Sequence, residues 1–116
     1  MRIALAQINS VLGDFNFNKN KIIESIQSLS AKKSEMIIFP EGALFGYHPF
    51  DLLEREVLID QQIKCLKEII KTIPKNVYVL IGGFEKNKSK QGRPYFNTAF
   101  LCTKNKIVQI IQPSTI

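Results

Sequence analysis

The sequence is poor in the residues that build metal centres and disulfide frameworks. It has two cysteines, Cys65 and Cys102, and one histidine, His48. The cysteines form no C-x-x-C or Cys/His spacing, so we predict neither a metal site nor disulfides, and expect both thiols to be reduced and buried. His48 has no visible acid or metal partner, and we interpret it as a surface residue.

Long apolar runs are also missing. The first apolar stretch is interrupted by Gln7 and Asn9, and no segment approaches the ~20 apolar residues that a membrane-spanning helix needs. The amino-terminal residues do not resemble a signal peptide either. The sequence therefore predicts no membrane partner and, by default, a cytoplasmic location.

The composition suits one small globular domain, with 116 residues of which 45% are hydrophobic. A net charge of +6 would allow nucleic-acid binding, but the basic residues are scattered along the chain. The one dense basic patch, residues 86–90, is followed by Gly92 and Pro94, as is typical of a solvated loop. We therefore predict no nucleic-acid partner.

Apolar patterning predicts five strands. They are expected at Arg2–Asn9, Met36–Phe39, Val77–Ile81, Tyr95–Thr103 and Lys106–Ile111. Gly82 and Gly83 are expected to end the third strand, and the short connection between the last two strands indicates an antiparallel hairpin.

Helical periodicity predicts a first helix from about Asn18 to Lys33, capped by Asn16 or Asn18. A second helix is expected to open at Asp51-Leu52-Leu53, with Asp51 as its cap, and its long part is expected from about Asp60 until Pro74 stops it. Strands alternating with helices place the chain in the α/β class.

The chain is organised around the stretch Met36–Arg55, where an apolar strand gives way to a lone carboxylate. Pro40 has no N–H to continue a strand, so Glu41 is expected at the carboxyl end of a buried strand. Open α/β sheets keep their ligand chemistry at such ends. On this pattern alone, Glu41 could equally be a loop acid or a helix cap.

Three motifs in this stretch extend the interpretation: Phe39-Pro40-Glu41, Leu44-Phe45-Gly46-Tyr47 and Asp51-Leu52-Leu53. Together they resemble the carbon–nitrogen hydrolase (nitrilase) superfamily, and especially the amino-terminal glutamine-hydrolysing domain of glutamine-dependent NAD synthetases. Two positions depart from that pattern, since His48 stands where Pro is usual and Phe50 where Glu is usual. The resemblance continues in Ile3–Gly13, Tyr78–Gly83 and Tyr95–Lys106.

The resemblance implies a fold that is the amino-terminal part of a four-layer α-β-β-α sandwich, with residues 1–116 as a partial domain. The family hydrolyses amides with a Glu, a Lys and a Cys. Only the Glu is carried over, to Glu41 as general base, while Tyr47 is expected to line the glutamine pocket. The family's Lys comes after the strand equivalent to Lys106–Ile111, so neither Lys104, before this strand, nor Lys106, at its start, takes that role, and Cys102 precedes the place of the family's nucleophile.

The function that the resemblance implies is an amino-terminal fragment of the glutamine-hydrolysing, ammonia-supplying domain of NAD biosynthesis, inactive alone. It implies no cofactor for this chain, because ATP and deamido-NAD would belong to an absent synthetase domain. The alternative is a non-catalytic α/β module for binding or assembly, and a third reading is an unrelated flavodoxin-like domain. Because a second sheet is missing, we also predict self-association or a completing partner chain.

Overall fold

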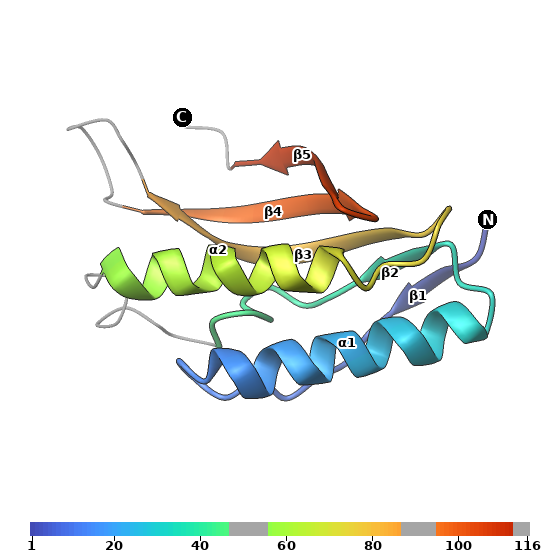
Figure 1. Ribbon diagram of the computed structural model, residues 1–116, viewed down its shortest axis with the longest axis horizontal. Helices are drawn as coiled ribbons and strands as arrows, with labels where there is room; N and C mark the ends of the chain where they lie inside the picture. Colours follow the sequence, from blue (N-terminus) through green and yellow to red (C-terminus); the bar gives the residue numbers. More distant parts are fainter. Residues whose placement is uncertain (47–55, 87–94, 113–116) are drawn as a thin grey trace.

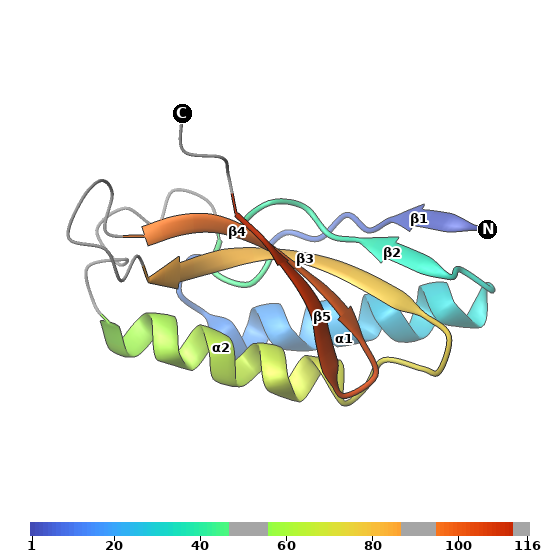
Figure 2. The same ribbon diagram turned by 90° about the horizontal axis from the view of Figure 1, so that it is seen from above.

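In the part of the chain that the structure describes, five strands form one sheet and two helices cover one of its faces (Figures 1 and 2). This computed structural model describes residues 1–46, 56–86 and 95–112. In chain order the elements are β1 (Ile3–Leu5), α1 (Phe15–Ala31), β2 (Met36–Ile38), α2 (Glu56–Ile70), β3 (Tyr78–Lys86), β4 (Tyr95–Thr103) and β5 (Lys106–Ile111).

The strands lie in the order β1-β2-β3-β4-β5, so neighbours in the sequence are neighbours in the sheet. β1, β2 and β3 are parallel, whereas β4 and β5 pair antiparallel. The predicted hairpin of β4 and β5 is confirmed with the expected bounds, and Asn105 turns the chain with a φ of 61°. The α/β class is confirmed, and the flavodoxin-like reading is wrong because such folds are built on parallel strands.

The predicted ends of two strands are wrong. β1 is only the three residues Ile3–Leu5, and β3 continues through Gly82 and Gly83 to Lys86. The strand does not end at these glycines. Other parts of the chain approach its backbone closely there. A Cβ on Gly83 would lie 2.8 Å from Gln62 Oε1, so only glycine lets α2 approach β3 at this point.

The first helix begins earlier than predicted, and the second contains the predicted long segment. α1 starts at Phe15, and Asp14 caps it by accepting a hydrogen bond from the Phe17 N–H at 3.0 Å, so the predicted caps at Asn16 or Asn18 are wrong. The described part of α2 runs from Glu56 to Ile70, so it includes the predicted long part from about Asp60 and ends before Pro74 as expected. The predicted cap Asp51 lies outside the described residues.

The core lies between the helices and one face of the sheet. One apolar stripe from each helix packs there against alternate strand residues, because successive side chains of a strand point to opposite faces. The fully buried members are Ile22, Ile26, Leu66, Ile69, Ile37, Val79, Ile81 and Cys102. We call this side of the sheet the helix-covered face.

The other side of the sheet, the open face, is apolar too. Leu5, Ile38, Leu80 and Leu101 are Cα partners in adjacent strands, so they form one row across the sheet. Leu5 is 74% exposed, and the other three are partly buried. Figure 2 shows both helices on the opposite side, so within the described ranges no helix covers this row.

Candidate functional site

The loop that follows β2 places Glu41 at the edge of the sheet. The Phe39 N–H donates to Leu80 O at 2.9 Å, which keeps the chain beside β3 until Pro40 ends the pairing. The chain then turns tightly, and the Gly46 N–H donates to Gly42 O at 2.7 Å. Glu41 therefore emerges at the carboxyl end of an interior parallel strand, as predicted.

The Glu41 loop, residues 40–46, is anchored from the amino-terminal part of the chain. Ser10 Oγ donates to Ala43 O at 2.6 Å, and the Gly13 N–H donates to Phe45 O at 2.9 Å. Between them, the buried Asn18 donates to Leu44 O at 2.9 Å. These bonds satisfy three successive carbonyls of the loop and hold its backbone against α1.

Asn18 also ties the preceding turn to the loop. Its side-chain amide accepts from the Val11 N–H at 2.7 Å and donates to Val11 O at 2.9 Å. Asn18 is fully buried, so these partners replace the water that its amide gives up. The residue that the sequence presented as a possible helix cap instead joins three segments under the Glu41 loop.

Gly82 of β3 determines on which face Glu41 lies. A Cβ on Gly82 would be 3.1 Å from Glu41 Cα and 3.2 Å from Gly42 N, so the loop rests directly on this glycine. Ile81 is buried on the helix-covered face, and Gly82 therefore points to the open face. Glu41 consequently lies at the open face of the sheet.

The carboxylate of Glu41 has a partner that the sequence analysis did not assign. Asn97 Nδ2 of β4 donates a hydrogen bond to Glu41 Oε1, and both side chains are exposed. The signal was present in the alternation of β4, where Asn97 and Leu101 point to the open face, while Thr98 and Phe100, which lie between them in the sequence, are buried on the helix-covered face. What could not be foreseen is that β4 brings its amide to a loop 56 residues earlier.

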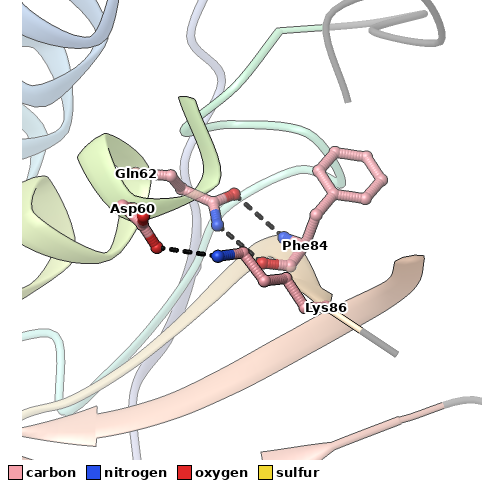
Figure 3. Close-up of polar contacts among 4 residues, drawn as sticks. All are labelled: Asp60, Gln62, Phe84 and Lys86. Atoms are coloured by element: carbon pink, nitrogen blue, oxygen red, sulfur yellow. Dashed lines mark hydrogen bonds and ion pairs between the residues drawn. The ribbon is translucent and has the colours of Figure 1, made fainter. Parts of the chain in front are cut away.

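A second set of contacts packs the Glu41 loop against α1 and β3, and ties β3 to α2. The Phe45 ring lies edge-on to Phe15 and Phe84, with centroids 5.0 Å and 5.7 Å apart. Gln62 of α2 donates to Phe84 O at 2.7 Å and accepts from the Phe84 N–H at 2.9 Å (Figure 3). The buried amide thus ties β3 to α2 beside the aromatic cluster.

Of the other candidate residues, those that the structure describes do not join Glu41. Tyr47, the predicted pocket residue, and His48 lie outside the described residues. Cys102 is fully buried on the helix-covered face, and burial raises the pKa of its thiol to about 11. Burial also raises the pKa of the partly exposed Cys65. Neither thiol has the lowered pKa of a nucleophile, in agreement with the sequence interpretation.

Two negative findings apply to residues 1–46, 56–86 and 95–112. No group of three or more His, Cys, Asp or Glu side chains there could hold a metal ion. No helix in the same ranges is long and apolar enough to span a membrane.

Comparison with known proteins gives a consistent family signal. The family model described as carbon–nitrogen hydrolase matches residues 2–112. The glutamine-dependent NAD(+) synthetase of Thermotoga maritima is 37% identical over 83 residues, which are 71% of this chain and 14% of the relative. The Synechocystis enzyme of the same name is 30% identical over 110 residues, covering 92% of this chain and 20% of the relative.

Solved structures agree on the fold. A glutamine-dependent NAD(+) synthetase from Cytophaga hutchinsonii superposes with a TM-score of 0.88 at 19% identity, over 100% of this chain and 19% of that one. An amidase from Nesterenkonia superposes with a TM-score of 0.80 at 20% identity, over 100% of this chain and 43% of that one. The chain thus spans a fifth or less of the length of the curated relatives above, and under half of the amidase.

Proposed function

The chain belongs to the carbon–nitrogen hydrolase family, and from that premise we propose that it is the glutamate-bearing portion of a glutamine-hydrolysing domain. The observation that carries the proposal is Glu41 at the carboxyl end of β2, on the open face, above Gly82. The backbone around it is held by hydrogen bonds from Ser10, Gly13 and Asn18. A catalytic base requires this kind of fixed support.

In the proposed reaction Glu41 is the general base. Breaking a carboxamide needs a nucleophile, a group that moves protons and positive charge for the tetrahedral oxyanion. Glu41 would take the proton of a cysteine thiol and later activate the water that cleaves the thioester. We propose that the Lys and the Cys come from a segment outside these 116 residues, and that Tyr47 lines the glutamine pocket.

The open face provides an apolar surface on which a further layer of the domain could pack. The row Leu5, Ile38, Leu80 and Leu101 lies beside the Glu41 loop, and its side chains remain partly or largely exposed. Fully burying one such side chain contributes roughly 1.5–3 kcal/mol, so covering the row would stabilise an assembled domain by several kcal/mol. We propose that the occupant is the second sheet of the domain, which would bring the missing Lys and Cys next to Glu41.

The same row favours a second candidate function, a non-catalytic module that binds a partner through the open face. This candidate uses the apolar side chains but has no need of Glu41. In the first candidate, ATP and deamido-NAD are substrates of a synthetase portion elsewhere, and this chain itself binds no cofactor. The cytoplasmic location stays a prediction in both.

The test is co-expression. The coding region after codon 116 is read in all frames for a Lys-x-x-Leu-Pro run and a later Cys-bearing strand, and the polypeptide it encodes is produced together with the chain. We expect no ammonia release from glutamine by the chain alone, because loss of the nucleophile lowers such rates by up to ~10⁶. The pair should release ammonia, and Glu41→Gln should abolish it.

Two results would oppose the proposal. Ammonia release by the isolated chain, sensitive to Glu41→Gln, would show that no completing segment is needed. A coding region without these motifs, or a stable pair whose activity is indifferent to Glu41→Gln, would favour the non-catalytic module. Glu24→Gln, which removes an exposed carboxylate on α1, is the matched control.

A further inference from the structure

We infer that Asn97 is a positioning residue that holds the carboxylate of Glu41 in one orientation, an inference that rests on the proposed role of Glu41 as general base. Asn97 Nδ2 donates to Glu41 Oε1. Glu41 follows β2 and Asn97 lies in β4, so the bond spans the width of β3. Gly82 makes the span short, because the loop rests on β3 where a side chain would otherwise stand.

The backbone bonds of the Glu41 loop do not by themselves orient the carboxylate. Ser10, Gly13 and Asn18 fix the carbonyls of residues 43–45, but an exposed Glu side chain can still rotate about its own bonds. The backbone of Asn97 is fixed by its pairing with Phe84 of β3. Its amide therefore reaches the carboxylate from β4, while the loop bonds hold the backbone of Glu41.

An amide suits this task chemically. The NH₂ group of Asn donates hydrogen bonds, carries no charge and takes up no proton near neutral pH. It can orient a carboxylate oxygen without neutralising the negative charge that a general base needs. An Asp in its place would repel Glu41, and a Lys would form an ion pair with it.

The first experiment measures the rotamer of Glu41 in the complete 116-residue chain. Three-bond NMR couplings about the Glu41 Cα–Cβ bond should report one dominant rotamer in the wild type. Asn97→Asp and Asn97→Ala should both shift these couplings to averaged values, while Asn20→Ala, which changes an exposed Asn of α1, should leave them unchanged. Unchanged couplings in both Asn97 variants would overturn the inference.

A second measurement does not depend on assigned spectra. Carbodiimide labelling of carboxylates, read by mass spectrometry, should modify Glu41 about threefold faster in Asn97→Ala, because the amide no longer occupies one carboxylate oxygen. The labelling of Glu24 serves as the internal reference. Equal Glu41 rates in wild type and variant would refute the inference. Neither measurement uses glutamine. A negative result would therefore refute the role of Asn97 without refuting the glutaminase proposal, and loss of the glutaminase proposal would leave these two results unchanged.

Discussion

Both faces of the sheet carry apolar side chains, but the two faces differ in what covers them. In β3, Ile81 is fully buried under the helices, while its neighbour Leu80 belongs to the partly exposed row of the open face. In β4 the same contrast holds between Cys102 and Leu101. α1 and α2 cover the helix-covered face. Within the described residues no helix covers the open face, which carries Glu41 and a row of apolar side chains. An apolar surface of this kind marks an interaction site.

The largest expected effect is on the free energy of unfolding, and it compares one substitution on each face of β3. Ile81→Ala should lower the free energy of unfolding by about 2–5 kcal/mol, because it leaves a cavity among fully buried neighbours. Leu80→Ala should lower it by about 1 kcal/mol or less, since water already reaches that side chain. Urea unfolding followed by circular dichroism measures both.

If Ile81→Ala does not fold, Ile81→Val provides the same comparison, with an expected loss of about 0.5–1.5 kcal/mol in the free energy of unfolding. Equal losses for Ile81→Ala and Leu80→Ala would mean that the open face is already covered in solution, and would remove the distinction between the two faces.

A smaller effect is expected from pH, through Cys102. Burial raises the pKa of this thiol from 9.0 to about 11. Between those values the unfolded chain has already lost the proton that the folded chain retains, so the free energy of unfolding falls as pH rises. The contribution is complete below about pH 9, and its loss towards pH 11 amounts to at most about 2–3 kcal/mol.

Urea unfolding at about pH 8 and pH 10 measures this fall. Cys102→Ala removes the thiol, and the variant should lose less stability than the wild type over the same interval. Lysines titrate in both proteins and cancel in the comparison. Identical pH dependence would show that the folded thiol is open to solvent, against its position on the helix-covered face.

The smallest expected effect on folding stability concerns the open face. The pair Leu80→Lys and Leu101→Glu places opposite charges on facing positions of β3 and β4, and should change the free energy of unfolding by less than about 1 kcal/mol. It should nevertheless abolish self-association, which we expect of the wild type because its apolar row is partly exposed. Light scattering after size-exclusion chromatography measures the mass.

The matched control is Gln27→Lys with Gln61→Glu, which adds the same two charges at exposed positions of α1 and α2. The control should associate as the wild type does. A wild type that stays monomeric at every concentration would contradict the prediction of self-association and show that the open face tolerates water.

Local patterns predicted the elements well where one rule applied to one segment. Alternating apolar residues and a short turn were enough for the bounds of β4 and β5, and Pro40 was enough to end β2 before Glu41. Helix starts were less predictable, because Asp14 and the asparagines after it are all competent caps and packing decides among them. Asn18 is buried under the Glu41 loop, which leaves Asp14 as the cap.

The site was predictable only as far as Glu41. The roles of Gly82 and Asn97 arise from contacts between a loop and two later strands, and no local rule reports them. A glycine pair in a strand is ambiguous between a break and a close approach, and the structure resolves it as close approach for both Gly82 and Gly83. The role of Tyr47 stays a prediction, since it lies outside the described residues.

β3 is longer than β2, and this difference affects which strand edges of the sheet could pair with another chain. β3 runs on past the end of β2, and its overhanging edge would be a template for a foreign strand. Gln62 occupies both the N–H and the carbonyl of Phe84 there, and Lys86 pairs with Asp60 at 3.2 Å (Figure 3). A side-chain amide thus takes the place of a neighbouring strand, and β1 and β5 are left as the edge strands of the described sheet.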